Sequence, residues 1–148
     1  MPTYFIQTFG CQMNLAESNK IRELLEQNSF KTAGSFKSAD LVIINTCTVR
    51  QAPENKLIEM TRTLKALKKT KKIQLAVTGC VANLVLSINL KKPDQNLAKK
   101  LDGVDLFFKS ADLAALENFL KELNHNTAKN IPIAQPEFSA YIPISTGC

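Results

Sequence analysis

Histidine and long apolar runs are scarce in the 148-residue sequence, which has one histidine and no hydrophobic stretch approaching the roughly 18 residues of a transmembrane helix. Its first residues, MPTYFIQTFG, show neither the basic region nor the long apolar region of a signal peptide. These absences favour a cytoplasmic protein without a membrane segment. Thiols stay reduced there, so we expect the four cysteines to be metal ligands or catalytic groups rather than disulfides.

Acidic residues are missing between Glu59 and Asp94, and the whole chain has a net charge of +6. The same window holds a run of basic residues: Arg62, Lys65, Lys68, Lys69, Lys71, Lys72, Lys91 and Lys92. Such a run is typical either of a solvated helix face or of a surface that meets phosphates. The charge alone does not decide between these two interpretations.

The apolar pattern alternates between strand and helix. Runs rich in β-branched and aromatic residues predict strands at 3–8, 30–33, 41–45, 73–78 and 104–108. Helical spacing lies between them. The first helix is expected to have Asn14 as its N-cap and Glu17 as the capping-box partner, and Pro53 fits the first turn of the second.

Further helices are predicted at 111–123 and, less regularly, from residue 83 onward. Strands that alternate with helices imply a parallel sheet covered on both faces. We therefore predict an α/β, flavodoxin-like doubly wound fold, with a five-stranded, mostly parallel sheet in the order 2-1-3-4-5. This domain would span residues 1–123. The polar stretch 124–138 reads as a linker, and 139–148 as the start of a further domain.

Three of the four cysteines directly follow predicted strands: Cys11 follows the first, Cys47 the third and Cys80 the fourth. These strands are neighbours in the predicted order, about 4.8 Å apart, so the three loops should meet within about 10 Å at the ligand-binding edge of the sheet. Gly10 and Gly79 would let the backbone approach a bulky ligand closely. Each cysteine also precedes a predicted helix, whose N-terminus favours the thiolate.

Three thiolates suit a soft metal centre. Iron–sulfur clusters use cysteine thiolates, whereas a tetrahedral zinc site usually takes a fourth protein ligand. The histidine, His125, lies in the predicted linker, so a cluster with one open iron fits better than structural zinc. Two alternatives stay open: a zinc- or iron-sensing domain, and a flavodoxin-like binding module that holds no cluster.

Several segments carry a family resemblance. TFGCQMN at 8–14, NTCTVR at 45–50 and TGCVA at 78–82 resemble the N-terminal domain of the radical-SAM methylthiotransferases, and the match continues to YIPISTGC at the end of the sequence. The variant CQMN is similar to the branch that modifies N6-dimethylallyladenosine next to the tRNA anticodon. Sibling branches, which act on threonylcarbamoyladenosine in tRNA or on ribosomal protein S12, are the alternatives.

The resemblance implies two [4Fe-4S] clusters. Cys11, Cys47 and Cys80 would bind an auxiliary cluster that carries sulfur. Cys148 would be the first ligand of the cluster that cleaves S-adenosyl-L-methionine, and because the rest of its CxxxCxxC triplet is missing, we expect an inactive N-terminal part of a longer enzyme.

The implied reaction has two stages. S-adenosylmethionine first gives a methyl group to the carried sulfur, and a radical made from a second molecule then takes hydrogen from C2 of the adenine before the methylthio group is inserted. The implied partners of this monomeric enzyme are tRNA and an electron donor.

Residues beside the cysteines are expected to surround the auxiliary cluster: Gln12, Asn14, Asn45, Thr46, Thr48 and Arg50. Arg50 is also the best candidate for a phosphate contact, with a structural salt bridge as the alternative. The basic residues at 62–72 end the helix that follows Cys47. Because that helix runs back along the sheet, we expect them at the opposite pole and not as the main tRNA contact.

Overall fold

The structure, a computed structural model, describes residues 1–47, 51–86 and 99–127. They form a five-stranded sheet in the order β2-β1-β3-β4-β5, and every strand pair is parallel. The strands are β1 (Thr3–Phe9), β2 (Lys31–Thr32), β3 (Leu41–Thr46), β4 (Gln74–Gly79) and β5 (Leu106–Phe107). The described helices are α1 (Gln12–Gln27), α2 (Gln51–Leu67), α3 (Cys80–Leu86) and α5 (Ala114–Thr127). The predicted fold class and strand order are confirmed.

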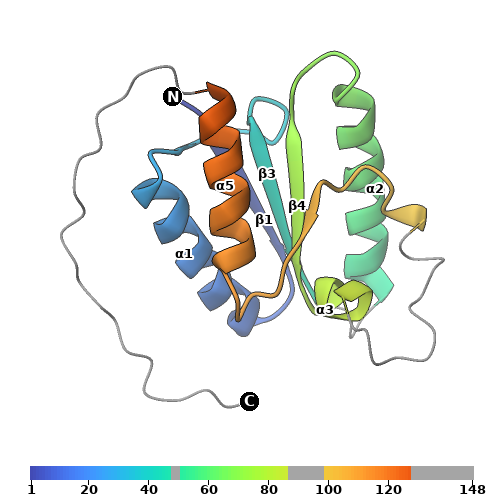
Figure 1. Ribbon diagram of the computed structural model, residues 1–148. Helices are drawn as coiled ribbons and strands as arrows, with labels where there is room; N and C mark the ends of the chain where they lie inside the picture. The colour runs from blue at the N-terminus through green and yellow to red at the C-terminus, as the bar shows by residue number, and fades with distance from the viewer. Residues whose placement is uncertain (48–50, 87–98, 128–148) are drawn as a thin grey trace, which may run out of the picture.

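The central strands are buried on both faces. All of β3 is buried, as is all of β4 beyond its first residue, which explains the apolar runs LVII at 41–44 and LAV at 75–77. Figure 1 shows that α1 and α5 cover one face of the sheet while α2 and α3 cover the other. Ile43 packs in one core with Ile21 and Leu116, whereas Ile44 packs in the other with Leu57. The alternation of β3 side chains therefore joins two helical layers.

The start of α1 differs from the prediction. Asn14 is not the N-cap: the helix begins at Gln12, Cys11 is the N-cap and Asn14 is the third helical residue. The side-chain oxygen of Asn14 accepts the Cys11 backbone N–H at 3.2 Å, so Asn14 caps the helix from inside its first turn. The consequence is that Cys11 lies directly at the helix N-terminus.

Other boundaries shift at the ends of elements. α5 runs to Thr127, so residues 124–127 of the stretch predicted as a linker are helical. α3 begins at Cys80, earlier than the helix predicted from residue 83, and residues 87–98 lie outside the described part of the chain. The same holds for the predicted boundary between 138 and 139. Among the described helices, none combines the length and the apolar character needed to cross a membrane.

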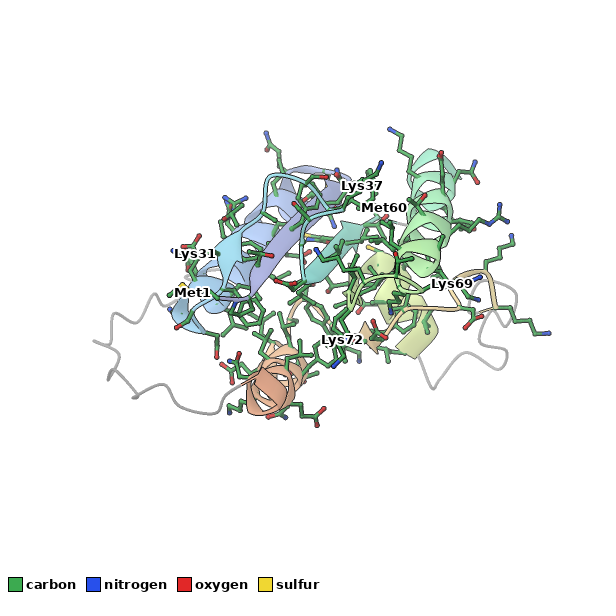
Figure 2. The ribbon with its side chains drawn as sticks, turned by 90° about the horizontal axis from the view of Figure 1, so that it is seen from above. Met1, Lys31, Lys37, Met60, Lys69 and Lys72 are labelled. Atoms are coloured by element: carbon green, nitrogen blue, oxygen red, sulfur yellow. The ribbon has the colours of Figure 1, made fainter. Side chains whose placement is uncertain are left out.

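Parallel strands give the domain two distinct poles. The carboxyl ends of β1, β3 and β4 lie together at the pole drawn at the bottom of Figure 1. α2 runs back from that pole, so its C-terminal end and the start of β4 lie at the other one. Figure 2 views this second pole, where Lys69 and Lys72 are labelled. The expectation that the basic end of α2 lies away from the cysteines is confirmed.

Candidate metal centre

The register of the sheet aligns the three strand ends that carry cysteines. Phe9 pairs with Thr46 across β1 and β3, and Thr46 pairs with Gly79 across β3 and β4. Cys47 and Cys80 directly follow this row, and the Cys47 N–H donates to the Phe9 carbonyl at 3.0 Å. Adjacent strands lie about 4.8 Å apart, so the cysteine-bearing turns are neighbours. The predicted convergence of the three backbone segments is confirmed.

Two glycines allow the turns to pack this closely. Gly79 has φ +93°, and a Cβ there would lie 2.2 Å from the carbonyl oxygen of Thr46. A Cβ on Gly10 would lie 2.4 Å from Oδ1 of Asn14 and 3.2 Å from Cβ of Cys47. A side chain at either position would separate neighbouring turns, which is why glycine precedes Cys11 and Cys80.

The Cys11 thiol lies in an environment that favours negative charge. It is exposed at the N-terminus of α1, and the backbone N–H groups of Asn14, first, and of Met13 lower its pKa below the ordinary thiol value. Slight desolvation by neighbouring atoms and the nearby Glu17 carboxylate oppose this lowering of the pKa but do not reverse it. Cys11 therefore has more thiolate character than an ordinary cysteine.

Cys47 and Cys80 are half-buried, and they and Cys11 are all present as thiols rather than as disulfides. As their side chains lie, no three His, Cys, Asp or Glu residues of the described segments form a ligand group for a metal ion. The structure thus brings the three backbones together without arranging their thiols around one point. A four-iron cluster spreads its protein ligands over different iron atoms, so its cysteines need adjacent loops more than a single shared centre.

The donor set matches an iron–sulfur centre better than a zinc site. Three thiols at adjacent strand ends supply soft ligands, and tetrahedral zinc would take a fourth protein ligand. His125 lies in the last turn of α5, and that end of the helix is at the pole opposite the cysteines (Figure 1). The last turn of α5 therefore lies away from this edge, and the residues present there fit a cluster.

Behind the cysteines lies a buried pair of amides, Asn14 and Asn45, which are 2% and 0% exposed. Nδ2 of Asn14 donates to Oδ1 of Asn45 at 3.0 Å, and Nδ2 of Asn45 donates to the carbonyl oxygen of Asn14 at 2.8 Å. Oδ1 of Asn14 in turn accepts from the N–H of Cys11, and from its thiol at 3.4 Å. The amide pair therefore connects Cys11 on α1 to strand β3.

Further polar residues extend this network into the domain. Nδ2 of Asn45 also donates to Oγ of Ser18 at 3.1 Å, and Ser18 shares a 2.8 Å hydrogen bond with Thr8. Glu17 accepts from Oγ of Ser110 at 2.7 Å. The sequence did not indicate roles for Thr8, Ser18 or Ser110. The signal that could have found them is a polar residue, Asn45, at the end of an otherwise apolar buried strand, which requires partners.

The remaining predicted site residues have mixed outcomes. Gln12 is the exposed first residue of α1, and Thr46 is fully buried in β3, where its hydroxyl donates to the Cys47 carbonyl at 3.5 Å. Thr48, Arg50 and Cys148 lie outside the described residues, so their predicted roles remain predictions.

A doubly wound α/β sheet with three thiols at adjacent strand ends defines a class of protein: a flavodoxin-like domain with a cysteine-lined sheet edge. Within this class the family is shown. The model of the family described as uncharacterized protein family UPF0004 matches residues 3–108, and the chain belongs to this family. It is the N-terminal domain of methylthiotransferases, which confirms the resemblance seen in the sequence.

Several curated relatives are named tRNA-2-methylthio-N(6)-dimethylallyladenosine synthase. The chain is 32% identical over 144 residues to the protein of Mycobacterium sp. (strain MCS), covering 95% of this chain and 26% of that one. It is 30% identical over 162 residues to the protein of Hydrogenobaculum sp. (strain Y04AAS1), covering 98% and 35%. For Corynebacterium efficiens the identity is 29% over 161 residues, covering 99% and 29%. The chain thus spans between about a quarter and about a third of the length of these relatives.

Proposed function

We propose that this chain is the N-terminal part of a radical-SAM methylthiotransferase that inserts a methylthio group at C2 of N6-dimethylallyladenosine beside the tRNA anticodon. Cys11, Cys47 and Cys80 hold its auxiliary [4Fe-4S] cluster. The observation that carries the proposal is the aligned row of strand ends, which makes the three cysteine-bearing turns of a UPF0004 domain neighbours. The names of the relatives support the choice of substrate.

When bound, such a cluster supplies an iron that no protein thiolate occupies and a sulfur atom for transfer. The protein residues hold and orient it. The α1 backbone N–H groups that lower the Cys11 pKa also stabilise negative charge at this edge. The half-buried Cys47 and Cys80 anchor the other side, and the absence of a Cβ at Gly10 and Gly79 keeps the three turns close.

The proposed enzyme also needs groups that lie outside this sheet edge. A second [4Fe-4S] cluster, with Cys148 as one ligand, would cleave S-adenosylmethionine with an electron from a reducing partner. The chain covers only 26% to 35% of these relatives, so the 148 residues alone are proposed not to modify tRNA. The complete enzyme is proposed to act as a monomer in the cytoplasm.

Nucleoside analysis tests the proposed activity. Deleting the gene in its source organism should remove 2-methylthio-N6-dimethylallyladenosine from digested tRNA and leave the unmethylthiolated nucleoside in its place. A plasmid copy of the complete gene should restore the modification, and the Cys11→Ala copy should not. Loss of the methylthio form of threonylcarbamoyladenosine instead would assign the sibling tRNA branch. An unchanged nucleoside profile would refute a tRNA methylthiotransferase and leave the ribosomal protein S12 branch, which mass spectrometry of that protein would test.

A further inference from the structure

One buried side chain touches all three cysteine-bearing segments. Asn45 lies in β3, two residues before Cys47, and is fully buried. Its side-chain amide bonds to Asn14 in both directions, at 3.0 and 2.8 Å. Asn14 in turn accepts the backbone N–H of Cys11. Asn45 therefore links the strand that carries Cys47 to the turn that carries Cys11.

The third segment lies against the same amide. A Cβ on Gly79, the residue before Cys80, would lie 2.8 Å from Oδ1 of Asn45. A Cβ on Gly10 would lie 2.4 Å from Oδ1 of Asn14. The two asparagine side chains thus occupy the space that the two glycines leave open. A longer or shorter side chain at Asn14 or Asn45 would therefore disturb the backbone at Gly10 or Gly79, which lies in close contact with it.

Burying two amide side chains costs free energy unless all of their polar atoms make hydrogen bonds. No buried side-chain nitrogen or oxygen of the described residues lacks a hydrogen-bond partner, so the amide pair is matched on all its buried atoms. A leucine pair could fill this space for stability alone, but it could not hold the Cys11 N–H.

We infer that Asn45 and Asn14 are positioning residues, which fix the spacing of the Cys11, Cys47 and Cys80 turns so that a cluster can bind across them. The inference rests on the proposed function, because it presumes that these thiols hold a cluster. Neither asparagine needs to touch the cluster. Asn45 acts through the Gly79 turn and through Asn14, and Asn14 acts through the Cys11 backbone.

The experiment compares neutral, shortened variants. Asn45→Ser and Asn14→Ser each remove the amide-to-amide contact without adding charge. Thr61→Val is the matched control, because Thr61 is 1% exposed and donates one buried hydrogen bond, to the Leu57 carbonyl at 2.8 Å, within α2. Each 148-residue chain is reconstituted anaerobically with ferrous iron and sulfide. The measurements are the rate of bleaching by an iron chelator and the electron paramagnetic resonance spectrum of the reduced cluster.

Both asparagine variants should lose the cluster about tenfold faster than wild type, with an altered spectrum, as expected when residues that orient metal ligands are removed. Thr61→Val should stay within about twofold and keep the wild-type spectrum, even if it lowers thermal stability. Unchanged kinetics and spectra in both asparagine variants would overturn the inference. Failure of the Asn14→Ser chain to fold would also overturn the inference, because the amide pair would then be required for folding of the whole domain rather than for the spacing of the turns. If wild type itself forms no cluster, the proposed function fails instead.

Discussion

Gly79 is the most constrained single residue at the cysteine edge. Its φ of +93° is one that L side chains rarely adopt, and Thr46 backbone atoms and the Asn45 amide leave no room for a Cβ. Because Gly79 immediately precedes Cys80, the backbone conformation of Gly79 sets the position of the Cys80 backbone from which the thiol projects. Its effect should appear in stability and in cluster binding alike.

Two glycine-to-alanine substitutions measure the effect of this constraint on stability. Gly79→Ala should lower the free energy of unfolding by about 2 kcal/mol or more, because both the backbone conformation and the space oppose a side chain. Gly34→Ala is the control, since no atom lies within 4 Å of a Cβ there, and it should change stability by less than about 1 kcal/mol. Urea denaturation followed by circular dichroism measures both. Equal effects would contradict the assignment of strain to Gly79.

At this scale the sequence predicted the cysteines and their glycines, but not the amide pair as a unit. Asn14 and Asn45 were each expected near the cluster as neighbours of a cysteine. Their mutual hydrogen bonds depend on the packing of α1 over β3, which residue order does not specify. The same packing explains why Asn14 caps α1 from inside the helix rather than preceding it.

At the scale of secondary-structure elements, the basic C-terminal end of α2 makes structural contacts. Nζ of Lys68 donates to the Gly103 carbonyl at 2.7 Å and pairs with Asp105, while Lys65 pairs with Asp102. These contacts fasten the C-terminal end of α2 to the segment before β5. Part of the basic run therefore has a structural use at the pole opposite the cysteines.

The two aspartates should differ in importance. Oδ2 of Asp105 also accepts the Leu75 backbone N–H at 2.7 Å. Asp105→Ala therefore removes the acceptor of that N–H in β4 and the ion pair of Lys68, which keeps only the Gly103 carbonyl. We expect a loss of about 2 kcal/mol in the free energy of unfolding. Asp102→Ala removes only the exposed pair with Lys65 and should have a much smaller effect at neutral pH than Asp105→Ala. Chemical denaturation of both variants checks this, and the reverse order would contradict it.

The Asp102 pair also has a defined pH dependence. The hydrogen bond from Lys65, first, and its charge lower the pKa of the Asp102 carboxyl below the ordinary value. A lowered carboxyl pKa means that the stabilisation is present above the unfolded-state pKa and is lost as the pH falls through the folded-state pKa. Any stability difference between wild type and Asp102→Asn should therefore shrink on acidification. A difference that grew at acidic pH would reverse the sign and contradict this account.

The basic pole gives a prediction about tRNA. Lys69 and Lys72 make no side-chain hydrogen bond or ion pair within the described segments, so their charge can be reversed without breaking the contacts of Lys68. In the complete enzyme, Lys69→Glu with Lys72→Glu should leave the slope of log affinity for tRNA against log salt nearly unchanged. Arg50→Ala should reduce the slope by about 1. A drop of about two in the double variant would make this pole an RNA-binding surface.

The strands and helices themselves were largely predictable. β3 and β4 each contain an apolar run and were found within a residue of their ends. β5 was predicted longer than it is, and the helix predicted at 111–123 began too early and ended too early, since α5 spans Ala114–Thr127. A strand at the edge of a sheet and the ends of a helix depend on neighbours rather than on their own sequence.

On the scale of the whole molecule, the two poles have different roles. The carboxyl ends of the strands place thiols, glycines and buried amides at one pole, while charged side chains at the other tie α2 to the chain before β5. Strand order converts cysteines far apart in sequence into neighbours, which is why alternation of strands and helices sufficed to predict that the three cysteine-bearing turns meet. The orientation of each thiol was not predictable, since it depends on rotamers and on the ligand itself.

The central claim is that Cys11, Cys47 and Cys80 act as one ligand set, and iron and sulfide analysis of single variants tests it most directly. After anaerobic reconstitution of the 148-residue chain, alanine at any one of the three should sharply lower bound iron and sulfide and the broad visible absorbance, because two thiolates hold a four-iron cluster poorly. Cys148→Ala should leave them at the wild-type level. Loss of the cluster in Cys148→Ala together with its retention in Cys80→Ala would contradict the account.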